Sequence, residues 1–144
     1  MLVVICAGCE TSQATPSEVS APMPIITLTP APAQSAVVGQ AINDLNQQPQ
    51  LLRNTIVKLA GVVWNADKTD GAYFLDAAFS PSTITDANGV FVFDNLKPGD
   101  YIIVIGDPFG AYAIVTEASG KAKVFTADKD QVLNVGKVTV KIAQ

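Results

Sequence analysis

The loop that follows Trp64 gathers side-chain oxygens of the kind that bind hard cations. Its oxygen-bearing side chains are Asn65, Asp67, Thr69, Asp70 and Asp76. Oxygen ligands at alternate positions suit Ca²⁺. The same residue types also populate ordinary hairpin loops, and Gly71 comes one residue late for an EF-hand loop. We therefore expect solvated turn residues here and no metal site.

Histidine is absent from the whole chain. This removes the commonest general base near neutral pH and the commonest metal ligand. Both cysteines, Cys6 and Cys9, lie in the first ten residues, so neither can line a site inside a folded domain. The remaining Asp, Glu, Lys, Ser and Tyr residues form no recognisable set of nucleophile, base and stabiliser. We expect no enzyme activity and no cofactor.

Three aromatic residues, Trp64, Tyr73 and Tyr112, could form an exposed platform for sugars. An aromatic face offers apolar area and polar edges at little entropic cost. The alternative is ordinary packing of these rings in the core or in loops.

The composition favours a globular domain that does not bind polyanions. The chain is 49% hydrophobic and 15% charged, with a formal net charge of −4. Such a chain can bury a core, and its negative charge disfavours nucleic acid and anionic membrane surfaces. We expect no nucleic-acid partner.

The strands around residues 90–105 are apolar on both faces. The residues on the second face are Val90, Val92, Ile102 and Val104. An exposed sheet face is normally polar, so something must cover these side chains. The cover is either a loop or strand of the same chain, or a partner protein or second copy, for which Val92 and Val104 are the candidate contact residues.

The N-terminus carries an apolar run, residues 2–5, followed by Cys6-Ala7-Gly8-Cys9. This resembles the lipobox of bacterial lipoproteins. The resemblance implies cleavage before Cys9, a lipid on its sulfur, and a signal peptide over residues 1–8. The signal is truncated, because a basic start is missing and the apolar run is shorter than the usual length of about 7 to 15 residues.

Residues 9–36 read as a linker. They hold Pro16, Pro22, Pro24, Pro30 and Pro32 among Ser, Thr and Ala, and no Lys or Arg. Such density favours polyproline II, so a disordered tether could reach roughly 80 Å when extended. The short apolar piece Pro24–Leu28 leaves open a docking peptide instead.

From Val37 onward, short alternating runs are separated by Gly, Asn, Asp and Pro, which predicts an all-β domain over residues 37–144. The predicted strands are 37–42, 55–64, 72–75, 82–85, 90–94, 101–105, 112–117, 122–126 and 133–142. Turns at Asn88-Gly89 and Pro98-Gly99 predict consecutive antiparallel strands. Helix is limited to residues 42–48 at most.

Two pieces in succession carry a family resemblance: Thr85-Asp86-Ala87-Asn88-Gly89-Val90-Phe91-Val92-Phe93 and Leu96-Lys97-Pro98-Gly99-Asp100-Tyr101. The pattern resembles carboxypeptidase regulatory-like domains. The resemblance implies a prealbumin-like, Greek-key β-sandwich of about seven to nine strands. In that fold Phe91, Phe93, Tyr101, Ile103 and Ile105 point into the core, and Tyr101 forms a tyrosine corner.

Sandwich domains of the related pilin and adhesin class can form a Lys–Asn isopeptide bond assisted by a buried acid. Lys58 and Asn134 are the residues that could take part here. The strand after Tyr101 lacks the acid, because residues 102–105 are all apolar. We expect no such bond.

Together these patterns indicate a non-catalytic lipoprotein of the cell envelope, lipid-anchored on the extracytoplasmic side of the membrane. We expect its sandwich to bind polysaccharide or an envelope protein. The alternative is a structural spacer or assembly subunit with no small ligand. The fold implies no function by itself.

Overall fold

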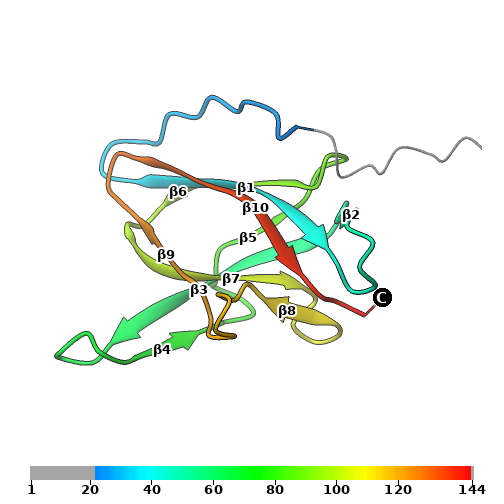
Figure 1. The fold of residues 1–144 in the computed structure, drawn as a ribbon. Coiled ribbons are helices and arrows are strands. Elements are labelled where there is room, and N and C mark those ends of the chain that lie inside the picture. The colour runs from blue at the N-terminus through cyan, green and yellow to red at the C-terminus, as the bar shows by residue number, and fades with distance from the viewer. Residues whose placement is uncertain (1–21, 144) are drawn as a thin grey trace, which may run out of the picture.

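The computed structural model describes residues 22–143, which form ten strands in two facing sheets (Figure 1). The strands are β1 (Ser35–Asn43), β2 (Gln50–Leu51), β3 (Ile56–Trp64), β4 (Gly71–Phe74), β5 (Ser82–Ile84), β6 (Val90–Leu96), β7 (Gly99–Gly106), β8 (Tyr112–Ile114), β9 (Val124–Ala127) and β10 (Val132–Val140). The described residues contain no helix, and hence no apolar helix of membrane-spanning length. The predicted all-β sandwich is confirmed.

Each sheet is built on its central strands. In the first sheet, which we call sheet A, β1 pairs in parallel with β10 on one side and antiparallel with β6 and β2 on the other. In the second, sheet B, β3 and β7 pair with each other; β4 and β5 share the outer edge of β3, and β8 and β9 share that of β7.

The core lies between the two sheets and contains the predicted residues. Phe91 and Phe93 of β6 meet edge to face, with ring centroids 6.1 Å apart, and Ile103 and Ile105 of β7 are fully buried in the same cluster. Gly39 lets β1 pass close to this cluster, because a Cβ atom there would lie 2.4 Å from the Phe91 ring. Period-two alternation therefore identified the inward face correctly.

The predicted pairing of consecutive strands around residues 90–105 is wrong. β6 pairs with β1 in sheet A, whereas the following strand β7 pairs with β3 in sheet B. The reason is that both strands carry large apolar side chains on one face, and these bury each other best from opposite sheets. The chain crosses between the sheets at Lys97, where the Tyr101 hydroxyl donates to the Lys97 carbonyl at 2.6 Å. This contact confirms the tyrosine corner.

The turn at Asn88-Gly89 is confirmed, although it also links the two sheets. The Asp86 carboxylate accepts from the backbone N–H groups of Asn88 and Val90, at 2.8 and 2.9 Å, and Gly89 has a φ of 70°. A glycine suits this positive φ because a Cβ atom would lie 2.9 Å from the Ala41 carbonyl oxygen.

All nine predicted strands are present, and the sequence missed only the two-residue strand β2. No helix forms over residues 42–48. β1 continues to Asn43, whose side chain exchanges two hydrogen bonds with the backbone of Ile142, at 2.9 and 3.0 Å. A turn follows in which Gln47 has a φ of 57°, which no right-handed helix allows.

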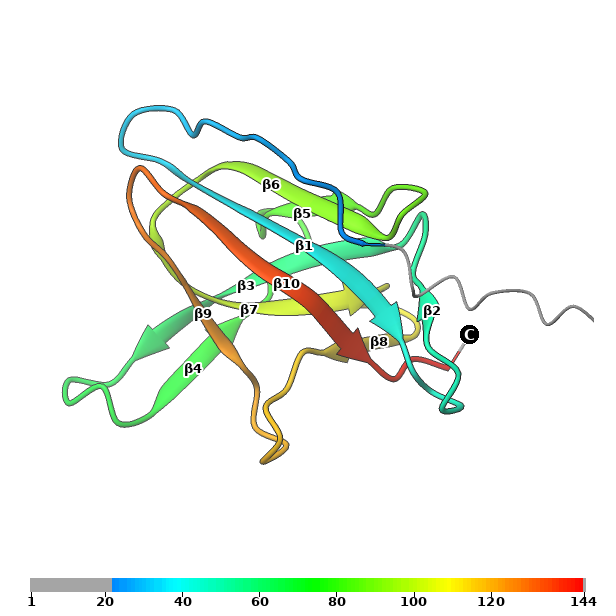
Figure 2. The ribbon, with the colours of Figure 1, turned by 45° about the horizontal axis from the view of Figure 1, so that its top comes forward.

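Residues 22–34 form an extended segment that runs along the outer face of sheet A above β1 and β6 (Figures 1 and 2). We call this segment the strap. Met23, Ile26, Leu28 and Pro30 are half-buried, whereas Ile25 is 98% exposed. The strap thus matches the docking alternative that the sequence left open for Pro24–Leu28.

Candidate binding surface

The outer face of sheet B carries an apolar cluster of its own. Ala60 of β3 and Ile102 and Val104 of β7 point away from the main core and are nevertheless buried, Val104 to 1% exposure. Their cover consists of half-buried side chains of the same chain: Val62, Leu75, Ile114, Ala122 and Val124. Val104 is therefore covered by the protein itself, which was the first of the two alternatives that the sequence left open. In this structure it offers no surface to a partner.

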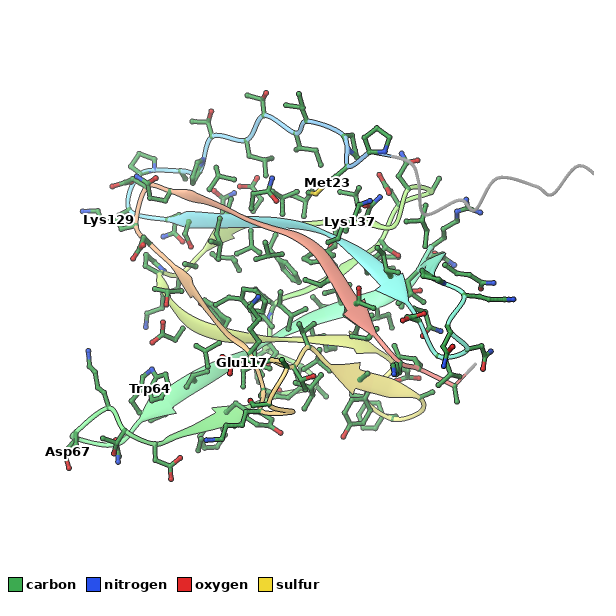
Figure 3. All side chains as sticks on the ribbon, in the orientation of Figure 1. Met23, Trp64, Asp67, Glu117, Lys129 and Lys137 are labelled. Atoms are coloured by element: carbon green, nitrogen blue, oxygen red, sulfur yellow. The ribbon has the colours of Figure 1, made fainter. Side chains whose placement is uncertain are left out.

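Two connections supply part of this cover, and backbone or side-chain hydrogen bonds fix both. In the hairpin between β8 and β9, Glu117 N–H donates to the Lys121 carbonyl at 2.8 Å, and Lys123 N–H donates to the Val115 carbonyl at 2.9 Å. Figure 3 labels Glu117 in this hairpin. Between β4 and β5, the Lys58 ammonium donates to the Ala77 carbonyl at 3.2 Å.

Trp64 ends β3 on this same face and is held by a carboxylate (Figure 3). Its indole N–H donates to Asp100 Oδ2 at 2.6 Å, while the Thr126 hydroxyl donates to Asp100 Oδ1 at 2.7 Å. Asp100 lies on β7 directly opposite Thr126 of β9. Gly71 of β4 lies opposite Trp64, and a Cβ atom there would come within 2.9 Å of the indole ring. Residues of β7, β9 and β4 therefore fix the position of the indole ring.

The hydrogen bonds to Asp100 also act on its ionisation. The Thr126 hydroxyl and then the Trp64 indole lower the pKa of Asp100 below its ordinary 3.8, with a smaller contribution from the charge of Lys68; partial burial opposes them. Each of these groups stabilises the ionised carboxylate. Asp100 is therefore charged at neutral pH and binds the indole N–H through a charge-assisted hydrogen bond.

Of the other two predicted aromatic residues, the structure brings only Tyr73 near Trp64. Tyr73 of β4 lies opposite Val62, on the same face as Trp64 and diagonal to it, and is 46% exposed. Tyr112 lies opposite Gly106, at the far end of β7 from Asp100. At about 3.3 Å per residue, the two ends of this strand are roughly 20 Å apart. We call Trp64, Tyr73, Asp100 and Thr126 the platform.

Sequence reasoning missed Asp100 and Thr126. Alternation from Tyr101 does put Asp100 on an outward face, and that was the available signal. No sequence pattern pairs β9 with β7, so nothing indicated that Thr126 would meet Asp100.

The remaining predicted site residues lie elsewhere. Val92 of β6 is half-buried on the outer face of sheet A, opposite Val38 and beside the strap. Cys9 lies outside the described residues.

Two hollows of the described surface lie away from the platform. One of about 510 Å³ lies at the open edge between β5 and β6, beside Asp94, Lys97 and Tyr101. The other, of about 160 Å³, is lined mainly by Asn and Gln side chains next to β2. Trp64, Tyr73, Asp100 and Thr126 line neither of them.

The loop after Trp64 uses its oxygens within the hairpin. Asn65 Oδ1 accepts from the backbone N–H groups of Thr69 and Asp70, at 2.9 and 3.2 Å. Within residues 22–143, no three His, Cys, Asp or Glu side chains come together as a metal site.

Lys58 and Asn134 lie on opposite outer faces of the sandwich. Lys58 alternates with the core residues Val57 and Leu59 of sheet B, and Asn134 pairs with the outward-facing Val38 of sheet A. An isopeptide bond between them is excluded by this placement.

No family model matches the chain, and no curated protein matches it. Among solved structures it is similar to a candidate carbohydrate-binding protein from Pseudomonas aeruginosa, with 20% identity over 78% of this chain and 92% of that one, at a TM-score of 0.47. It is also similar to a minor pilin of Streptococcus agalactiae, with 13% identity over 78% and 46% of the two chains at 0.43. A major pilin subunit of Bacillus cereus gives 15% identity over 78% and 31% at 0.42. At these values the similarity carries no function to this chain.

Proposed function

We propose that this protein is a non-catalytic recognition module of the cell envelope and that it binds a polysaccharide across the platform. The observation that carries the proposal is the 2.6 Å hydrogen bond between the Trp64 indole and Asp100. It holds an aromatic ring in one orientation on a sheet face, next to the half-exposed ring of Tyr73.

A ring held in advance suits sugar binding for a physical reason. The apolar C–H face of a pyranose packs on an aromatic face, and a ring that is already fixed loses little conformational entropy when the sugar binds. The Asp100 carboxylate and the Thr126 hydroxyl bonded to it lie beside the ring and can bind sugar hydroxyls, and Tyr73 carries a further hydroxyl on the same face of the sheet. The platform therefore combines apolar area with polar groups.

The charge around the platform favours a neutral polysaccharide. The loop after Trp64 carries Asp67, Lys68 and Asp70, and Asp100 binds the Trp64 indole, so negative charges outnumber positive charges among these four residues. An anionic polymer would be repelled by this excess of negative charge. We propose neutral glycans as the ligand class.

The membrane anchor and the family are further parts of this proposal, and both rest on the sequence. A lipid on Cys9, after removal of residues 1–8, would attach the module to the extracytoplasmic side of the membrane. The turn and strand motifs around Asn88-Gly89 and Pro98-Gly99 support a carboxypeptidase regulatory-like domain.

Trp64 makes the binding test direct, because it is the single tryptophan of the chain. Titration with neutral polysaccharides should change its fluorescence, and titration with an anionic one should not. Affinity electrophoresis should show retardation that Trp64→Leu abolishes and Tyr73→Ala weakens. Tyr112→Ala is the matched control, since Tyr112 is similarly exposed at 50% but lies at the other end of the sheet. Equal retardation of the Trp64→Leu and wild-type proteins would refute the platform as the site.

The second candidate function is a structural spacer or assembly subunit. It is favoured by the cover that the chain supplies for Val104, which leaves this side chain no surface for a partner. A spacer predicts that no neutral polysaccharide retards the protein, and that immobilised protein retains no glycan or envelope protein from an envelope extract.

The anchor is tested separately. A full chain expressed with its natural upstream sequence should incorporate radiolabelled palmitate, and Cys9→Ser should abolish the label. Label that persists in Cys9→Ser would place the lipid elsewhere and refute this part of the proposal.

A further inference from the structure

The outer face of sheet A is buried although it points away from the core. Val38 and Gln40 of β1 alternate with the inward-facing Gly39, yet both are almost fully buried, Val38 to 2% exposure. The strap runs above β1 and β6 (Figures 1 and 2), and Met23 is directed toward the sheet in Figure 3. The strap is therefore the cover of this face.

The strap is attached mainly at its C-terminal end. There, Ala31 N–H donates to Asn95 Oδ1 at 3.2 Å, Ala33 N–H donates to Asp130 Oδ1 at 2.7 Å, and Asp130 N–H donates to the Gln34 carbonyl at 2.7 Å. Among the described residues, no backbone-to-backbone hydrogen bond joins residues 22–30 to the sheet. This part of the strap therefore has no strand pairing with the sheet, and segments with few backbone hydrogen bonds to the rest of the fold open at low free energy.

The fit between strap and sheet is incomplete. Gln40 donates through Nε2 to the Asn88 carbonyl at 2.8 Å, but its buried Oε1 finds no donor among the described residues. A buried acceptor without a donor is unfavourable. The turn that leads from the strap into β1 also places Ala33 at a φ of 65°, a conformation that residues other than glycine disfavour. Both features weaken the closed arrangement.

We infer that the outer face of sheet A is an acceptor surface for an extended apolar segment, filled within the molecule by the strap and open to the strap of a second copy of this chain. We infer a second copy as the partner because its strap has the same sequence. When two copies exchange straps, each sheet A keeps the same contacts with a strap, now from the other copy. Exchange of identical elements through a hinge is a general route to dimers.

The two arrangements compete through concentration. A strap joined to its own sheet has an effective concentration in the millimolar range, so the closed monomer prevails in dilute solution. Exchange becomes favourable when copies are crowded. Val92 lies on this face, so it would belong to the exchanged interface.

A labelled synthetic peptide of residues 22–34 tests the acceptor surface. Its target is the full chain with Ile26→Asp and Leu28→Asp, which remove the two half-buried aliphatic anchors. We expect the peptide to bind this variant at least ten times more tightly than it binds the wild-type chain, whose surface is occupied. A peptide with Ile25→Asp should bind equally well, because Ile25 is exposed.

Two results would overturn the acceptor surface. One is failure of the peptide to bind the double variant when circular dichroism shows the wild-type fold. The other is equal binding to the wild-type chain and the double variant. If the double variant fails to fold, Leu28→Ala replaces it with the same expectations.

Sedimentation at concentrations up to the millimolar range tests the exchange itself. We expect a wild-type dimer that persists in Ile25→Asp and disappears in the Ile26→Asp, Leu28→Asp chain. A wild-type chain that stays monomeric throughout, or a dimer that survives in the double variant, would overturn exchange between copies.

Discussion

The two outer faces of this sandwich are both apolar, and the chain covers them in different ways. Sheet B is covered by side chains of its own strands and of two connections between them, and hydrogen bonds hold both connections. Sheet A lies under the strap, which hydrogen bonds join to the domain at residues 31–34 and which, among the described residues, makes no backbone-to-backbone hydrogen bond to the sheet over residues 22–30. A covering segment that lies between two paired strands opens only when the sheet opens. A covering segment without strand pairing, such as the strap, can open separately.

This difference separates the two proposed binding regions. On sheet B, the platform is rigid because Trp64, Asp100 and Thr126 belong to three paired strands. On sheet A, the acceptor surface becomes available only when the strap leaves. The preformed platform suits a ligand such as a glycan, which binds without a change in the protein. The acceptor surface suits a segment that can displace the strap that already occupies it.

The largest effect should come from the core that both faces share. Phe93→Ala should lower the free energy of unfolding by about 3–5 kcal/mol, because it removes a buried ring from between the sheets. Chemical denaturation followed by Trp64 fluorescence measures this. An unchanged midpoint would show that the core does not tie the two sheets together.

Val104→Ala and Val38→Ala compare the two covers directly, since the two valines are equally buried on opposite outer faces. Val104→Ala should cost about 2 kcal/mol, because the fixed connections cannot close over the lost methyl groups. Val38→Ala should cost less than about 1 kcal/mol, because the strap can shift onto the smaller side chain. Equal losses in denaturant titrations would contradict the difference between the covers.

Tyr101→Phe should cost about 1 kcal/mol through loss of the hydrogen bond from the hydroxyl to the Lys97 carbonyl. This bond holds the crossing between β6 and β7, and so fixes how sheet A sits on sheet B. Tyr112→Phe is the control and should leave the thermal midpoint unchanged, because Tyr112 is 50% exposed and its hydroxyl makes no hydrogen bond to the described residues. A similar loss in both variants would argue against the corner.

The smallest effect should appear only in acid, at the platform. The pKa of Asp100 is lower in the folded protein than its ordinary 3.8, so the carboxylate contributes stability above that value and the contribution disappears as pH falls through the folded pKa. The melting temperature of Asp100→Asn should therefore fall less than that of the wild type between about pH 5 and pH 3. A parallel fall in the two proteins would contradict the role of Asp100.

Much of the fold was predictable because its signals are local. Alternation located nine strands and the inward face of β6 and β7, and turn residues located the bend at Asn88-Gly89 and the tyrosine corner. Pairing was less predictable. β6 and β7 are neighbours in sequence, yet long-range burial of Phe91 and Phe93 against Ile103 and Ile105 sends them to different sheets.

The candidate site was predictable only in part. Trp64 and Tyr73 could be named as aromatic residues, but only the register of β3 with β4 makes them neighbours. The positions of Val92 and Val104 showed that the outer faces of both strands are apolar. They did not show which segments cover these faces. A composition rich in proline indicated a tether over residues 9–36. The short apolar piece Pro24–Leu28 within it left docking open but gave too weak a signal to predict where it packs.

The sequence by itself determined that this protein is an all-β domain without histidine chemistry, because strand periodicity, turn residues and composition act locally and need no knowledge of the partner strand. The tertiary structure alone decided that Asp100 binds both Trp64 and Thr126, that Val104 is covered by strands and connections of its own sheet, and that the strap covers sheet A. Each of these depends on which strands pair and in what register, and pairing is selected by the burial of the whole core, not by any single segment.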